Sequence, residues 1–230
     1  MTPDVTRARG AAAGFAVPVG ALIMVIALVA TPGPWWQGYV SEAGTAAAPW
    51  ATAYRAGLVL LGAGVALLGL ALRPSSRAVA ALLGGAAVLA ATSGTVPCTD
   101  RCPLPPFEPT TWGDVVHTAA SIVGMVLLAG AMAVVAGSSA FRGAQRRLAV
   151  IAVTLTVPLG GALGLTMLFV GRGPLGSIVE RILLAVAVSW LTGTAILTVL
   201  RNSVRVEPWT PPRRIPSSAE SPSSNAASRS

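Results

Sequence analysis

The sequence has few charged residues and no lysine. Only 10% of its 230 residues are charged, against about 25% in soluble globular proteins, and 53% are hydrophobic. This composition excludes an ordinary soluble domain and predicts a membrane protein. All 16 basic residues are arginine, against 8 acidic residues, which gives a net charge of +8. Most of the arginines lie in short runs between apolar segments, where they orient a membrane protein, so we predict no nucleic-acid binding.

Histidine is almost absent as well, since His117 is the single one in the chain. One histidine excludes a three-histidine zinc hydrolase and bis-histidine haem ligation. The sequence also lacks a Walker-type Gly-Lys-Ser/Thr loop and an acidic cluster within its apolar segments. We therefore predict no cofactor, and a role other than catalysis is favoured.

Six apolar segments are long enough to cross a bilayer, whose hydrocarbon core of about 30 Å needs roughly 20 helical residues. They predict an all-α polytopic protein, a bundle of six transmembrane helices over residues 11–200. Residues 1–10 form a short N-terminal segment, and residues 201–230, rich in Ser and Pro, are expected to be a disordered tail. The first run is longer than a signal-peptide core, so it is expected to remain as an anchor. The predicted spans are 11–30, 56–72, 78–96, 115–137, 148–170 and 182–200.

The arginines are divided unequally between the two sides of these spans. Twelve lie on the side of the two termini, and four lie on the other side, namely Arg55, Arg101, Arg172 and Arg181. This asymmetry predicts an N-in, C-in topology with both termini in the cytoplasm. Abundant Ala, Gly, Val and Arg without Lys hints at a high-GC bacterial genome. We expect a multi-pass protein of the bacterial plasma membrane with membrane lipids as partners; the sequence indicates no protein partner.

The two cysteines, Cys98 and Cys102, lie in the second outer loop. Since that compartment is oxidising, we expect them to form a disulfide. A C-x-x-x-C pair can instead bind metal or act in redox exchange, but metal sites usually need four ligands and this loop has no histidine, while the redox motif is C-x-x-C. The prediction is a structural disulfide and no metal site.

Asp114 and His117, with Ser121 and Gly124, share one face of the fourth span. A carboxylate beside an imidazole suits a general base or a proton-linked site. Alternatively, Asp114 is a carboxylate favoured by the helix dipole and His117 is a packed interfacial residue. The sequence leaves both interpretations open.

Charged residues also lie at the outer mouths of other spans. Glu180 and Arg181 open the sixth span, Arg55 opens the second, and Glu42 lies in the first outer loop. Ion pairs of Arg55 with Glu42 or Glu180 are plausible, and the alternative is snorkelling at the interface. We predict that one network beneath the outer loops contains Glu42, Arg55, Asp114, His117, Glu180 and Arg181.

Glycine is frequent within the spans, and Gly160 and Gly164 form a G-x-x-x-G step just after Pro158. Small residues at this spacing let helices approach closely, so we expect these glycines to pack against another helix.

Five short motifs occur in a fixed order relative to the six spans. They are Ser41-Glu42-Ala43-Gly44, Tyr54-Arg55-Ala56-Gly57, Val96-Pro97-Cys98, Gly113-Asp114-Val115-Val116-His117 and Glu180-Arg181. Over about residues 15–200 the sequence resembles the six-helix bacterial and archaeal family catalogued as domain of unknown function 998. A more distant analogy connects it to the Frag1/DRAM/Sfk1 group. The resemblance implies no activity, but it directs attention to Ser41, Glu42, Arg55, Asp114, His117, Glu180 and Arg181.

The leading functional hypothesis is an outward-facing polar pocket that binds a lipid headgroup or small ligand through Glu42, Arg55, Glu180 and Arg181. One alternative is a small proton-coupled transporter, although the two three-span halves show no repeat. The other alternative is a membrane hydrolase with His117 as base, Asp114 as its orienting group and Ser41 as nucleophile.

Overall fold

The computed structural model describes residues 3–103 and 107–203. All six predicted helices are present in this part of the chain, and each is long and apolar enough to cross a membrane. The all-α, six-span architecture is therefore confirmed, while most of the predicted tail, residues 204–230, lies outside the described residues. The helices are α1 (Pro3–Ala30), α2 (Ala51–Leu72), α3 (Arg77–Thr95), α4 (Trp112–Gly137), α5 (Ala144–Phe169) and α6 (Pro174–Ser203), and a short 3-10 helix, η1 (Val40–Gly44), precedes α2.

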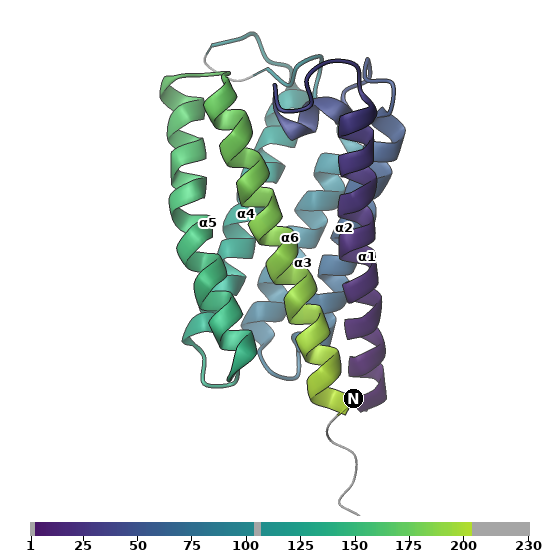
Figure 1. Cartoon of the computed structure of the whole chain (residues 1–230), viewed down its shortest axis with the longest axis vertical. Helices are drawn as coiled ribbons and strands as arrows, with labels where there is room; N and C mark the ends of the chain where they lie inside the picture. The colour runs from purple at the N-terminus through teal and green to yellow at the C-terminus, as the bar shows by residue number, and fades with distance from the viewer. Residues whose placement is uncertain (1–2, 104–106, 204–230) are drawn as a thin grey trace, which may run out of the picture.

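The six helices form a closed ring in which each packs against its neighbours in the chain, and α1 packs against α6 to close it (Figure 1). Two ends of the bundle differ. The long-loop end carries residues 31–50, 96–103, 107–111 and 170–173, whereas the short-loop end carries residues 73–76 and 138–143. The start of α1 and the end of α6 lie together at the short-loop end.

Several helices begin before the predicted spans do. The second begins at Ala51 instead of residue 56, and the sixth at Pro174 instead of residue 182. Hydropathy misses these turns because they carry polar side chains, yet the local sequence favours helix. Pro174 is suited to a first helical position, because its missing N–H would have no partner there. The side chain of Thr111, just before α4, accepts a hydrogen bond from the Asp114 amide at 3.3 Å and forms a capping box with it.

Two glycines set the distance between α1 and α2. A Cβ atom on Gly20 would lie 2.6 Å from the carbonyl oxygen of Gly57, and one on Gly57 would lie 2.7 Å from the carbonyl oxygen of Gly20. The backbones therefore meet at a crossing that admits no side chain. This is the close packing expected of small residues in membrane helices, although Gly20 was not among the residues that suggested it.

The G-x-x-x-G step of α5 does not pack in this way, so that prediction is wrong for the described chain. Cβ atoms added at Gly160 or Gly164 would meet no atom within 4 Å, and Gly161 is equally open. Spacing alone does not determine which face a helix turns to its neighbours. α5 packs against α4 and α6 with other faces, formed in part by Ala149, Ala152 and other buried residues of the core.

Candidate functional site

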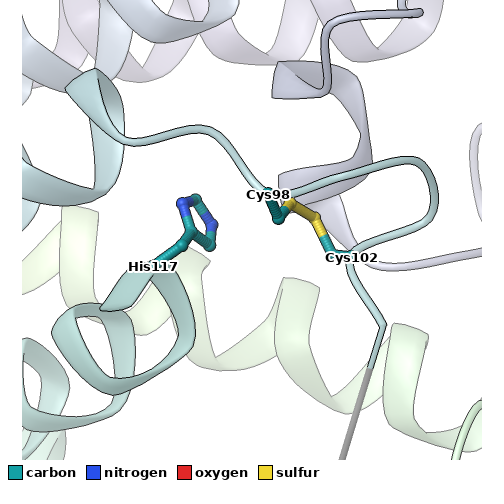
Figure 2. Close-up of side chains that lie close together, drawn as sticks. All are labelled: Cys98, Cys102 and His117. Carbon is teal, nitrogen blue, oxygen red and sulfur yellow. A yellow bond between two sulfur atoms is a disulfide. The ribbon is translucent and has the colours of Figure 1, made fainter. Parts of the chain in front are cut away.

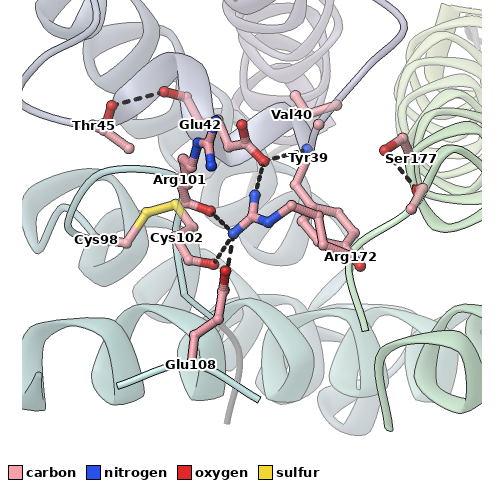
Figure 3. A network of polar contacts seen from close by, with 12 residues as sticks. Tyr39, Val40, Glu42, Thr45, Cys98, Arg101, Cys102, Glu108, Arg172 and Ser177 are labelled. Atoms are coloured by element: carbon pink, nitrogen blue, oxygen red, sulfur yellow. Dashed lines mark hydrogen bonds and ion pairs between the residues drawn. A yellow bond between two sulfur atoms is a disulfide. The ribbon is translucent and has the colours of Figure 1, made fainter. Parts of the chain in front are cut away.

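Arg172 is the centre of a polar network that joins three loops at the long-loop end (Figure 3). It lies between α5 and α6, and its guanidinium forms ion pairs with Glu42 of η1 and, at 3.2 Å, with Glu108. It also donates hydrogen bonds to the carbonyl oxygens of Arg101 and, at 3.3 Å, Cys102. A single planar cation in the turn between α5 and α6 thus connects this turn to the loop before α2 and the loop before α4.

The first long loop is shaped to present Glu42 to this cation. A carboxylate oxygen of Glu42 also accepts a hydrogen bond from the Tyr39 amide at 2.9 Å, which fixes the start of η1. The Arg172 guanidinium lies 5.9 Å from the centre of the Tyr39 ring, within cation–π range. Gly38 has a φ of +70°, and a Cβ there would lie 2.5 Å from the Glu42 carboxylate, so this turn requires glycine.

The first turns of α6 hold the same loop from the other side. Glu180 accepts a hydrogen bond from the Val40 amide at 2.7 Å. Arg181 donates to the carbonyl oxygens of Trp35 at 2.5 Å and Gly38 at 3.0 Å, and its guanidinium lies 6.0 Å from the Trp35 ring centre. Glu180 and Arg181 are adjacent on α6, yet both bind the first long loop, because this loop wraps around the start of the helix.

Six of the residues described above form what we call the arginine cluster: Tyr39, Glu42, Glu108, Arg172, Glu180 and Arg181. Three of its donor atoms are buried and have no hydrogen-bond partner within residues 3–103 and 107–203, namely Tyr39 Oη, Arg172 Nε and Arg181 Nε. Tyr39 is only 2% exposed. Burial, and then the negative charge of Glu180, raise the pKa of Tyr39 above its ordinary value, so its hydroxyl keeps its proton. The buried groups of the cluster that lack a hydrogen-bond partner in the described structure are therefore all hydrogen-bond donors.

Asp114 is part of a separate arrangement that ties the second long loop to α4. One carboxylate oxygen accepts hydrogen bonds from the Thr99 amide at 2.6 Å and its hydroxyl at 3.0 Å. The other accepts from the Thr111 amide and hydroxyl, both at 2.7 Å. These contacts agree with the alternative interpretation of Asp114 as a carboxylate at a helix N-terminus, and no hydrogen bond found in the described structure joins it to His117.

His117 faces α3, where it meets polar partners that the sequence did not indicate. Its Nδ1 lies 2.9 Å from the Val96 carbonyl oxygen, and Ser93 Oγ lies 3.2 Å from the same nitrogen. Ser93 is bonded in turn to Ser121 at 2.8 Å. The predicted face of Asp114, His117, Ser121 and Gly124 does turn toward α3, because a Cβ on Gly124 would contact Leu89 of that helix.

Cys98 and Cys102 lie at disulfide distance, with their Cα atoms 5.0 Å apart, as the sequence predicts. Figure 2 shows the imidazole of His117 beside the Cys98 end of this pair. One imidazole nitrogen and the two sulfur atoms all lie within 4.8 Å of one another, and all three residues are buried. We call Ser93, Cys98, Cys102, His117 and Ser121 the histidine cluster.

The six residues expected in one network therefore fall into separate groups. Glu42, Glu180 and Arg181 belong to the arginine cluster, while Asp114 and His117 have partners in the second loop and α3. Arg55 has a single hydrogen bond, from its Nε to the Ala51 carbonyl oxygen at 3.4 Å, and forms no ion pair with any residue that the structure describes. Ser41 sits on η1 beside Glu42, and no hydrogen bond among the described residues joins it to Asp114 or His117.

Sequence reasoning missed Arg172, Glu108, Tyr39 and Ser93. Arg172 is one of four outer arginines in the sequence, and one signal favours it: it lies in a tight Gly-rich turn between two spans, too short to let the side chain leave the bundle end. Ser93 lies within a predicted apolar span. Its small size permits the close approach of His117.

Comparison with known proteins gives one match. The family model described as "Protein of unknown function (DUF998)" matches residues 14–197, which is most of the chain and agrees with the resemblance drawn from the motifs. No curated protein and no solved structure matches the chain.

Proposed function

The chain belongs to the DUF998 family, and we propose that the arginine cluster of this integral membrane protein binds the phosphate of a lipid headgroup on the outer face of a bacterial plasma membrane. The observation that carries the proposal is the set of three buried donors without partners, Tyr39 Oη, Arg172 Nε and Arg181 Nε. Buried polar groups are normally satisfied, so such a set indicates a missing partner that accepts hydrogen bonds.

The distribution of arginine supports an outward-facing long-loop end. Arg73 and Arg77 flank one short loop, Arg142 and Arg146 flank the other, and the ends of α1 and α6 at this side carry further arginines. Positive residues concentrate on the cytoplasmic side of membrane proteins. The arginine cluster would then lie at the opposite, outer surface.

Exposed aromatic residues support placing the cluster at headgroup depth. Trp35 and Trp36 are about half exposed, at 48% and 51%, and Trp112 is 84% exposed, all at the long-loop end. Tryptophan favours the interface between hydrocarbon and water. Arg181 packs against Trp35, so a Trp35 ring at this interface would bring the guanidinium to the level of the lipid phosphates.

The carboxylates of the cluster are already engaged, and this determines the chemistry of the ligand. Glu42 accepts from Arg172 and the Tyr39 amide, and Glu180 accepts from the Val40 amide. What is left unpaired is two guanidinium N–H groups and one hydroxyl. A phosphate offers acceptor oxygens only and suits the planar donors of arginine.

The test is the binding of defined lipids to the purified full chain in detergent, read by native mass spectrometry. Phosphatidylglycerol is expected to bind, whereas diacylglycerol, which lacks the phosphate, is not. In a separate experiment, inorganic phosphate is added and the thermal unfolding midpoint is measured. A raised midpoint would assign the site to free phosphate. An unchanged midpoint would assign it to a phosphate carried by a lipid. Equal binding of diacylglycerol and phosphatidylglycerol would contradict the proposal.

Two variants and a matched control locate the site. Tyr39→Phe removes only an unpartnered hydroxyl, so it should weaken phosphatidylglycerol binding about tenfold, the equivalent of one hydrogen bond to a charged group, without lowering stability. Arg181→Gln should weaken binding at least as much. Arg55→Gln removes an arginine at the same end but outside the cluster and should leave binding unchanged. Unchanged affinity in Tyr39→Phe and Arg181→Gln would refute the assignment.

A further inference from the structure

The proton positions in the histidine cluster can be assigned from its hydrogen bonds. A carbonyl oxygen only accepts, so Nδ1 of His117 must carry the hydrogen that it shares with the Val96 oxygen at 2.9 Å. In the same way Ser121 must donate to the carbonyl oxygen of His117, at 3.0 Å. Ser121 Oγ is then free only to accept, so Ser93 donates to it at 2.8 Å.

This assignment leaves Nε2 of His117 with a lone pair and no donor among the residues that the structure describes. The single hydroxyl hydrogen of Ser93 is used on Ser121, although Ser93 Oγ lies 3.5 Å from Nε2. A neutral imidazole whose Nδ1–H is held by a backbone carbonyl is the usual state of a metal-binding histidine, because that bond fixes both the tautomer and the ring orientation. Nε2 is therefore prepared as a ligand atom.

The two sulfur atoms lie where they can complete a site with the imidazole. An imidazole nitrogen and both sulfurs lie within 4.8 Å of one another. In a tetrahedral zinc site, with Zn–S about 2.3 Å and Zn–N about 2.0–2.1 Å, the ligand atoms are about 3.6–3.8 Å apart. Shifts of about 1 Å would bring the three atoms to that geometry, and a Cα separation of 5.0 Å between the cysteines allows their sulfurs to separate.

We propose that reduction of the Cys98–Cys102 disulfide creates a site for a thiophilic metal ion, Zn²⁺ as the probe, from two thiolates and His117 Nε2. A dithiol supplies the two electrons: it is oxidised to its own disulfide while Cys98 and Cys102 become thiols. Zn²⁺ then binds the two sulfurs and displaces their two protons to solvent. With three protein ligands, the fourth position stays open to water. In the reverse exchange, a small-molecule disulfide takes up the two electrons and two protons from solvent and becomes a dithiol, while Cys98 and Cys102 form their disulfide again and release the ion.

The second loop contains no histidine, so the residues near the cysteines in the sequence predict no metal site. His117 comes instead from α4, fifteen residues after Cys102. Folding of the loop over the start of α4 brings the three residues together. Asp114, one helical turn before His117, holds this loop in place through Thr99.

The test is a Zn²⁺ titration of the full chain in detergent, purified without a polyhistidine tag. The reduced protein, freed of reductant under anaerobic conditions, is expected to bind one Zn²⁺ per chain, and the oxidised protein none. His117→Gln should weaken Zn²⁺ binding at least about tenfold. Thr118→Ala, at the next position of α4, is the matched control and should bind as the unchanged chain does. The double variant Cys98→Ser/Cys102→Ser should not bind.

A second measurement needs no substitution. Because His117 is the single histidine in the sequence, its imidazole resonances in NMR report directly on ligation. They should shift when Zn²⁺ is added to the reduced chain and stay fixed when it is added to the oxidised chain. Reduced protein that binds no Zn²⁺, or imidazole resonances unmoved by bound Zn²⁺, would overturn the proposal.

Discussion

Arg172 and Glu42, 130 residues apart in the sequence, form the ion pair that joins the loop between α5 and α6 to η1. Both side chains are about one quarter exposed, so water screens the pair only in part. The same guanidinium binds Glu108 and two backbone carbonyls, which makes it the most connected side chain of the arginine cluster.

Arg172→Ala should therefore lower the free energy of unfolding by about 1–3 kcal/mol, because it removes the ion-pair partner of Glu42 and the donor to two loop carbonyls. Arg55→Ala removes an arginine of the same end that lies outside the ion pairs, and its cost should stay below about 1 kcal/mol. Thermal and chemical unfolding in detergent measures both. Equal losses in the two variants would mean that Arg172 contributes no more than a surface charge.

Asp114→Ala should lower stability by about 2–3 kcal/mol, since the Thr99 and Thr111 amides would both lose their acceptor. Asp114→Asn keeps one carbonyl oxygen and should cost less. The control is Asp100→Ala, an exposed carboxylate in the same loop, which should change stability by less than about 0.5 kcal/mol. A loss for Asp100→Ala as large as for Asp114→Ala would contradict the assigned cap.

Gly20→Ala should destabilise the bundle by about 1–3 kcal/mol, because the added methyl would meet the Gly57 carbonyl oxygen. Gly160→Ala introduces the same methyl group at an open face of α5 and should be neutral or slightly stabilising, given the higher helix propensity of alanine. Unfolding of both variants in one detergent gives the comparison. If Gly160→Ala is the more damaging change, α5 must contact another helix that this chain alone does not provide.

The N-in, C-in orientation predicts opposite labelling of two introduced cysteines. Pro109→Cys, exposed in the second long loop, should react with a membrane-impermeant maleimide in intact cells. Ser139→Cys, exposed in a short loop, should react only after the membrane is permeabilised. The native cysteines are joined to each other, so neither competes for the reagent. Labelling of Ser139→Cys in intact cells would reverse the topology.

The helices could be predicted from the sequence, while most of the polar contacts could not. Each span is a local property, because about 20 apolar residues in a row have few alternatives to a membrane helix. Pairing of Arg172 with Glu42 depends on where two distant loops meet, which no local pattern encodes. The arginine count treated all four outer arginines alike, yet Arg172 is central to the cluster and Arg55 lies outside it.

The glycine spacing in the sequence also does not predict which side of a helix packs against its neighbours. Gly20 and Gly57 meet across a crossing, whereas Gly160 and Gly164, in the better-known spacing, face open space. For α4, by contrast, polarity gave the correct face, because Asp114 and His117 are costly to expose to lipid and so turn inward. Polar residues reveal orientation in a membrane, and glycine does not.

The second long loop belongs to both clusters, since Arg172 holds the carbonyls of Arg101 and Cys102 while the sulfurs of Cys98 and Cys102 lie within 4.8 Å of a His117 nitrogen. Thermodynamic linkage would then make the two proposed sites reciprocal. A ligand that draws Arg172 away from these carbonyls shifts the thiol–disulfide equilibrium of the loop. The redox state of the loop must change the affinity for that ligand by the same factor.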